Sequence, residues 1–315
     1  MSYLTHTFDE IKLQSGKTIL NAEIAYKTFG NLNDNKDNVI IYPTWYSGFI
    51  SDNEWLISED MTLNPNKYFI IIIAMINNGQ SCSSNGLNIT LYDNVIAQHR
   101  LVTEVFNINK IKLVTGWSMG AQQTYQWATL FPDMVESIVP FCGSARTSPH
   151  NFVFLEGLRN ILHLADSDEK LIKSFARVYA GWGLTQEFYK QRKWEVLGYK
   201  SLEDFLIGFW ETFFLKRNKQ NLLAHIWTWQ HGDVSDNPVY KGDFNAAMKA
   251  IKAKTIIISP DNDLYFPKDD NWDEIKLIEN SKLVVIPGVW GHFSGGGINK
   301  EDTMFINKIL KHILQ

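Results

Sequence analysis

The segment around Ser118 constrains the fold more than any other part of the chain. An apolar, β-branched run, Ile111–Thr115, leads into the pentapeptide Gly116–Gly120 and then into a helical pattern, Ala121–Leu130. A Gly-x-Ser-x-Gly sequence between a strand and a helix is typical of a very tight turn, in which only glycine fits beside the serine. We therefore expect Ser118 to stand above a sheet edge, at a helix N-terminus whose free N–H groups favour negative charge.

Length and composition set the broad class of protein. The chain has 315 residues, 45% of them hydrophobic and 20% charged, and a formal net charge of −4. This charge gives no electrostatic reason to expect a nucleic acid or an anionic membrane as partner. The longest apolar run, Tyr68–Ile76, is too short to span a bilayer, and the first residues do not resemble a signal peptide. We expect a cytoplasmic protein.

The two cysteines, Cys82 and Cys142, are too few for a disulfide framework or a zinc site. No metal-ligand spacing occurs in the sequence, so we expect neither a metal nor a bound cofactor. Cys142 lies near a predicted strand end, where a small buried side chain is favoured over a thiol nucleophile.

Short apolar strands alternate with helical patterns along most of the chain. This alternation predicts an α/β fold with a mostly parallel central sheet flanked by helices on both faces. A further strand, Thr18–Phe29, is predicted to pair antiparallel at the sheet edge. The expected buried strands are 38–43, 68–76, 111–115, 137–141, 255–259 and 282–286, and the expected core helices are 94–106, 121–130 and 300–314.

The middle of the chain carries only helical patterns and holds five of the eleven tryptophans. Because it falls between two predicted strands of one sheet, we expect an inserted helical cap, or lid, over the site. The predicted division is 1–145 for the first part of the core, 146–251 for the cap and 252–315 for the second part of the core. The expected cap helices are 151–165, 169–179, 187–197, 201–216 and 220–230.

A serine hydroxyl becomes a strong nucleophile only when a base takes its proton and an acid orients that base. In this type of fold the chain order is serine, acid, histidine, with each partner in a loop after a later strand. His292 lies in a glycine-rich loop after the last predicted strand, and it is the predicted base for Ser118. Asp261 and Asp263 both lie in the preceding such loop. Asp263 is favoured because its spacing to Pro267 resembles the Asp-x-x-x-Pro pattern of this loop in many proteins of this type, whereas Asp261 suits a turn cap.

Two backbone N–H groups are expected to bind the oxyanion of the reaction. One belongs to Met119, the residue after the nucleophile, and the other to the loop after strand 38–43, with Tyr46 preferred and Trp45 next. We predict that three aromatic side chains contact the substrate, because each is next in sequence to a predicted site residue: Trp45 to Tyr46, Trp117 to Ser118 and Phe293 to His292.

Together these motifs resemble the α/β-hydrolase superfamily, and within it the homoserine O-acetyltransferase-like branch. The resemblance rests on Pro43–Gly48, Asp93–Val95, Gly116–Gly120, Asp263–Pro267 and Gly291-His292, spread over nearly the whole chain. It implies a Ser-His-Asp triad, an acyl-enzyme intermediate and a helical lid that often forms a homodimer.

The chain departs from that branch at three positions. Phe293 stands where the acetyltransferases typically carry an aspartate for the substrate amine, Trp117 replaces an elbow glycine, and Tyr92 replaces an arginine. A phenylalanine cannot pair with an ammonium group, so homoserine is not the expected substrate.

The leading hypothesis is an enzyme that hydrolyses a small ester or thioester, so its expected partner is a small-molecule acyl substrate. The alternative is an O-acyltransferase with acyl-CoA as co-substrate, which needs a lid that excludes water. No basic cluster for the CoA phosphates stands out, which favours hydrolysis.

A third hypothesis, from another class, is a non-catalytic ligand-binding protein of the same fold. The intact triad argues against it, and the serine argues against an aspartate-nucleophile enzyme. The sequence is also compatible with a lyase.

Overall fold

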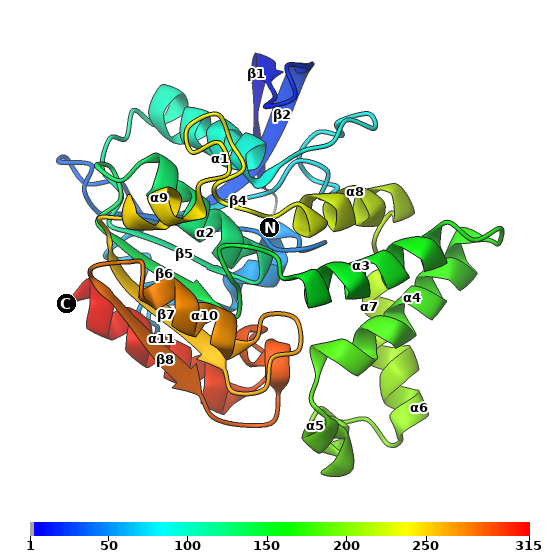
Figure 1. Cartoon of the computed structure of the whole chain (residues 1–315). Helices are drawn as coiled ribbons and strands as arrows, with labels where there is room; N and C mark the ends of the chain where they lie inside the picture. Colours follow the sequence, from blue (N-terminus) through cyan, green and yellow to red (C-terminus); the bar gives the residue numbers. More distant parts are fainter. Residues whose placement is uncertain (1–2) are drawn as a thin grey trace.

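The computed structural model describes residues 3–315, which form one eight-stranded sheet with helices on both faces and a group of helices beside it (Figure 1). The spatial order is β1-β2-β4-β3-β5-β6-β7-β8. All strands from β3 to β8 in chain order run parallel to one another. The strands are β1 (Leu4–Lys12), β2 (Thr18–Phe29), β3 (Val39–Pro43), β4 (Phe69–Ile73), β5 (Leu113–Trp117), β6 (Ser137–Phe141), β7 (Lys254–Pro260) and β8 (Ser281–Ile286). The predicted fold class is confirmed.

The central strands are buried on both faces because their apolar runs do not alternate with polar residues. Every residue of β3, β4, β5 and β6 is buried, as expected for parallel strands covered on both sides. Successive residues still point to opposite faces. Ile41 packs with the helices of one face, whereas its neighbour Ile40 packs with α11 on the other.

The edge of the sheet differs from the prediction. β2 pairs antiparallel with β4, as expected, but it is not the edge strand, because β1 pairs with its other side from Leu4 to Lys12. Most residues of β1 are exposed or half-exposed. Its sequence is correspondingly polar, which hides the strand from a search for apolar runs.

The core helices cover the two faces of the sheet. α1 (Leu91–Arg100), α2 (Met119–Leu130) and α9 (Phe244–Lys249) pack in one apolar cluster, and α11 (Lys300–Leu314) packs in the other, whereas α10 (Lys268–Ile275) follows β7. The predicted helix 94–106 is regular only to Arg100 and continues as a π-helical turn, Leu101–Val105.

The inserted helices build a third apolar cluster rich in aromatic side chains. They are α3 (Pro149–Leu162), α4 (Asp168–Gly183), α5 (Gln186–Lys190), α6 (Leu202–Phe205), α7 (Thr212–Phe214) and α8 (Lys219–Gln230). Two predicted helices are interrupted. Arg192, in a left-handed conformation, ends 187–197 early, and 201–216 contains a π-helical stretch, Leu206–Glu211. The domain division stays a prediction, and we note that Val234 and Met248, within the predicted cap, pack with the sheet.

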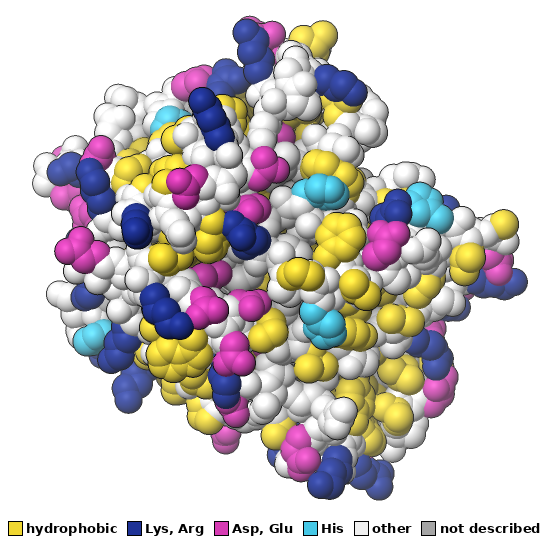
Figure 2. Space-filling model, in the orientation of Figure 1, with side chains coloured by type: hydrophobic (Ala, Val, Ile, Leu, Met, Phe, Trp, Pro, Cys, Tyr) yellow, Lys and Arg dark blue, Asp and Glu magenta, His cyan; other side chains and the backbone are white. Residues whose placement is uncertain are grey.

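The surface mixes both signs of charge, and yellow side chains gather toward the side of the cap helices (Figure 2). Large exposed apolar residues of this region are Phe152, Val153, Leu164, Val178, Val196, Leu202, Ile207 and Leu215. Across residues 3–315, none of the helices is long and apolar enough to cross a membrane.

Candidate active site

Ser118 lies at the sharp turn between β5 and α2, as the sequence predicts. Its backbone has φ 59° and ψ −123°, a conformation that L-residues rarely adopt, and its N–H donates to the carbonyl of Phe141 on the neighbouring strand. The flanking glycines are required by space. A Cβ on Gly116 would lie 2.5 Å from the backbone of Gly120, and one on Gly120 would lie 2.8 Å from the carbonyl oxygen of Pro43.

His292 and Asp263 reach Ser118 from the loops after β8 and β7. His292 Nε2 lies 2.9 Å from Ser118 Oγ, and His292 Nδ1 lies 2.7 Å from Asp263 Oδ2. The three side chains are at most 4% exposed. Asp263 Oδ1 accepts N–H bonds from Tyr265 (2.8 Å) and Phe266 (3.1 Å), which fix the carboxylate so that Oδ2 faces the imidazole.

The two candidate acids occupy different environments. Asp263 is buried and contacts His292, whereas the side chain of Asp261 is 44% exposed and pairs with Lys268. The structure therefore brings Asp263, and not Asp261, together with the serine and the histidine.

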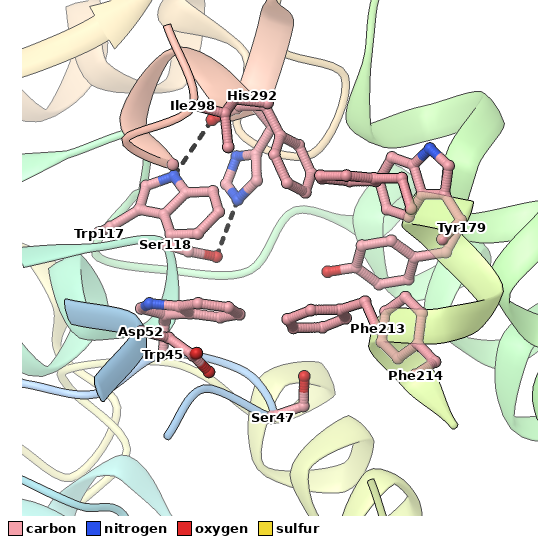
Figure 3. Close-up of a pocket in the computed structure, with 14 residues that line it drawn as sticks. Trp45, Ser47, Asp52, Trp117, Ser118, Tyr179, Phe213, Phe214, His292 and Ile298 are labelled. Atoms are coloured by element: carbon pink, nitrogen blue, oxygen red, sulfur yellow. Dashed lines mark hydrogen bonds between the residues drawn. The ribbon is translucent and has the colours of Figure 1, made fainter. Parts of the chain in front are cut away.

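Trp117 holds His292 in two ways. Its indole Nε1–H donates to the backbone oxygen of His292 at 3.1 Å (Figure 3), and its ring stacks on the imidazole with centroids 5.1 Å apart. Tyr265 and Phe266 enclose other sides of the imidazole, with centroids 4.8 and 5.7 Å away. From the sequence, Trp117 is predicted only to contact the substrate. No sequence pattern indicates that it packs against the loop that carries His292.

A cavity of about 190 Å³ opens beside Ser118 and His292 (Figure 3). The three predicted substrate contacts, Trp45, Trp117 and Phe293, all line it. The cap supplies most of the remaining wall. These further lining residues are Tyr179, Phe209, Trp210, Phe213 and Phe214 from the cap, and Ser47, Asp52, Gly296 and Ile298 from the core.

One end of the cavity carries an ion pair. The carboxylate of Asp52, which lines the cavity, accepts a 2.6 Å bond from Arg217. The Arg217 side chain is 4% exposed and lies over the rings of Phe49 and Phe213, and burial lowers its pKa. The carboxylate that lines the cavity is therefore already neutralised by a buried arginine.

The loop between β3 and the 3₁₀ turn Ile50–Leu56 leaves two N–H groups unpaired. Within residues 3–315, the N–H groups of Thr44, Ser47 and Gly48 each have an acceptor, and those of Trp45 and Tyr46 have none. The Tyr46 side chain does not line the cavity. It packs instead into the cap, stacked on Phe175 and Tyr179.

The Met119 N–H, at the first position of α2, is likewise without an acceptor in the described chain. Residues 3–315 contain no group of three or more His, Cys, Asp or Glu side chains placed to hold a metal ion.

Comparison with known proteins places this architecture. No protein-family model matches the chain. An ethyl acetate hydrolase of Pseudomonas veronii is 35% identical, over 97% of this chain and 92% of its own length. The crystal structure of an acetylester hydrolase from Corynebacterium glutamicum superposes with a TM-score of 0.95 at 35% identity, covering 99% of this chain and 96% of that one. A homoserine O-acetyltransferase of Chlorobaculum parvum is 27% identical, over 91% of this chain and 88% of its own length.

The chain thus belongs to the α/β-hydrolase superfamily, in its homoserine O-acetyltransferase-like branch. It is an enzyme of the class that comprises hydrolases and acyltransferases of this fold.

Proposed function

We propose that this enzyme hydrolyses small, uncharged acyl esters, acetyl esters above all, through Ser118, His292 and Asp263. The observation that supports this most strongly is the buried series of hydrogen bonds from Asp263 through His292 to Ser118 Oγ, which opens onto an apolar cavity. Two relatives at 35% identity are named for ethyl acetate and acetyl-ester hydrolysis, which supports the proposal.

In the first half-reaction the Ser118 oxygen attacks the ester carbonyl while its proton passes to His292 Nε2. Asp263 accepts the Nδ1–H of the imidazole and stabilises the positive charge that forms there. The tetrahedral intermediate collapses, and the C–O bond to the alcohol breaks. His292 returns the proton to the departing alkoxide, so an alcohol leaves and an acyl-enzyme remains.

The oxyanion of this intermediate would be bound by the Met119 N–H and by one N–H of the loop at residues 44–48. The free N–H groups of Met119, Trp45 and Tyr46 support this assignment, in which Tyr46 contributes through its backbone and not its side chain. Donors fixed before the reaction are worth about 10²- to 10³-fold in rate each.

In the second half-reaction water replaces the alcohol. His292 Nε2 takes a proton from the water as its oxygen attacks the acyl carbon, and the second intermediate releases the carboxylic acid. Ser118 recovers its proton from His292. The overall reaction consumes one ester and one water and needs no cofactor.

The walls of the cavity support a small, neutral substrate. A volume of about 190 Å³ is below the usual range for drug-sized ligands. Phe293 offers no charge to an amino group, and the carboxylate of Asp52 is already paired with Arg217. A substrate with neither a free ammonium nor a free carboxylate therefore suits these walls.

Transfer from acyl-CoA is the competing proposal, and homology to homoserine O-acetyltransferases is the observation that favours it. Within the described chain no lysine or arginine lines the cavity, and Arg217, which bonds the lining residue Asp52, is already paired, so the phosphates of CoA find no ready partner there. A homodimer formed through the cap and a cytoplasmic location stay predictions.

Acetate release should be measured with ethyl acetate and with acetyl-CoA, each with and without homoserine, using wild-type enzyme and Ser118→Ala. The proposal expects ethyl acetate turnover that is lost in Ser118→Ala and insensitive to homoserine. O-acetylhomoserine formed from acetyl-CoA at a higher rate would favour the transferase. Ligand binding without turnover of any ester would favour a binding protein.

A further inference from the structure

A cap histidine contacts the loop that carries the free N–H groups. His225 lies on α8 and is 1% exposed, with its ring between two core loops. Its Nδ1 accepts the backbone N–H of Ser47 at 3.2 Å, and its Nε2 lies 2.9 Å from the backbone oxygen of Ile76. Since a carbonyl oxygen can only accept, Nε2 carries the proton and Nδ1 is free to accept.

The ring is neutral in this arrangement. Burial lowers the pKa of His225 to about 4, so the Nδ1 lone pair remains available to Ser47 at neutral pH. The tautomer is thus fixed at both nitrogens by the backbone of the core, although the side chain belongs to the cap.

The loop at residues 44–48 is held along its length by hydrogen bonds to several segments, among them a 3.3 Å bond from Tyr46 Oη to the Leu222 oxygen on α8. Gln123 donates to the Thr44 oxygen at 2.8 Å, Asn78 donates to the Gly48 oxygen at 3.1 Å, and His225 accepts from Ser47 between them. Ser47 has a φ of 58°, a left-handed conformation that a serine keeps only when its surroundings enforce it. The bond to His225 is attached directly to this residue.

We propose that His225 is a positioning residue for ester hydrolysis: by accepting the Ser47 N–H, it holds the adjacent N–H groups of Trp45 and Tyr46 toward the oxyanion. This inference rests on the proposed function. It also makes catalysis depend on a correctly seated cap, because α8 supplies two attachments of the loop, one through His225 and one through the Leu222 oxygen.

Three substitutions separate the two bonds of the ring. Asparagine places an oxygen near the Nδ1 position and can accept from Ser47, glutamine places an amide near Nε2 and can donate to Ile76, and leucine does neither. We expect His225→Asn to retain most of the wild-type kcat, and His225→Gln and His225→Leu to lose about 10- to 100-fold with KM nearly unchanged.

Thr228→Val is the matched control. Thr228 lies on the same helix and donates a buried 2.7 Å bond to the backbone of Ile89, which is not part of the 44–48 loop. If the proposal holds, Thr228→Val keeps its kcat even where its unfolding midpoint falls as much as that of His225→Gln. The affinity for a boronic acid, which mimics the tetrahedral intermediate, should fall in parallel with kcat in the two impaired His225 variants.

Equal losses in His225→Asn and His225→Gln, or a loss in Thr228→Val as large as that in His225→Gln, would overturn the proposal and indicate a structural role only. So would a His225→Gln enzyme with wild-type kcat. These outcomes differ from failure of the proposed function, in which the wild-type enzyme itself would not hydrolyse esters.

Discussion

Replacing Asp263 with asparagine tests how the acid acts on the imidazole. Asparagine keeps the size of the side chain, and its carbonyl oxygen can still accept the N–H groups of Tyr265 and Phe266. Its NH₂ group would then face His292 Nδ1 in place of Asp263 Oδ2, 2.7 Å away in the wild-type enzyme. An amide N–H can only donate, so Nδ1 must become the acceptor and the ring proton must move to Nε2.

That tautomer cannot take the proton of Ser118, because the protonated Nε2 is the nitrogen that lies 2.9 Å from Ser118 Oγ. A loss of about 10⁴-fold in kcat is expected, as for the same substitution in a serine protease triad, which corresponds to roughly 5 kcal/mol of activation free energy. Substrate binding does not involve the tautomer, so KM should change by less than about threefold.

Steady-state hydrolysis of p-nitrophenyl acetate measures both constants, and circular dichroism checks the fold. Asp261→Asn is the control: this carboxylate is 44% exposed and pairs with Lys268 away from the triad, so kcat should stay within about twofold of wild type. Retention of more than a tenth of the wild-type kcat in Asp263→Asn, or inactivity of Asp261→Asn, would refute the reasoning.

Three other perturbations follow from buried groups. Burial raises the pKa of Glu274 from 4.5 to about 7, so the protonated form is favoured in the folded state, and the free energy of unfolding should fall by roughly 3 kcal/mol as pH rises from about 4 to 8. Glu274→Gln should flatten this dependence in urea titrations. Asp52→Asn leaves the Arg217 charge buried without its partner and should lower the free energy of unfolding by about 3 kcal/mol, again measured with urea. Trp117→Phe keeps a stacked ring but loses the indole bond to the His292 oxygen, and kcat should fall about 5- to 10-fold.

Each has a control. Asp273→Asn alters an 80%-exposed acid on the same helix as Glu274 and should leave the pH dependence intact. Asp52→Asn combined with Arg217→Met should recover part of the lost stability, and no recovery would speak against an ion-pair origin. Trp117→Leu should be slower than Trp117→Phe, since it loses the stacked ring as well as the bond. Equal rates would contradict the role given to stacking.

The sheet and the catalytic loops can be predicted from the sequence because each is indicated by a short, local pattern of residues. The apolar strand before Gly116, the glycines flanking Ser118 and the loops that follow β7 and β8 are all short patterns, and the structure places their side chains together. The edge strand β1 escapes the same method, since a half-exposed strand has no continuous apolar run.

Contacts between segments that are distant in the sequence cannot be predicted from local patterns. Ser47 and His225 are 178 residues apart, and in the sequence His225 is a lone histidine in the predicted cap helix 220–230, for which a packed or surface role is the natural interpretation. The same holds for Tyr46, whose side chain packs into the cap while its neighbour Trp45 lines the cavity. Which cap aromatics reach the cavity depends on the π-helical turn after Phe205, which periodicity alone does not reveal.

The central claim is that Ser118 forms an acyl-enzyme that water then hydrolyses. Acid quenching of the enzyme during turnover of p-nitrophenyl acetate, followed by intact and peptide mass spectrometry, tests it directly. The account predicts one acetyl group, on the peptide that contains Ser118, which is absent in Ser118→Ala and does not form at a measurable rate in His292→Ala. Acetylation at another residue, or ester hydrolysis that persists in Ser118→Ala, would contradict it.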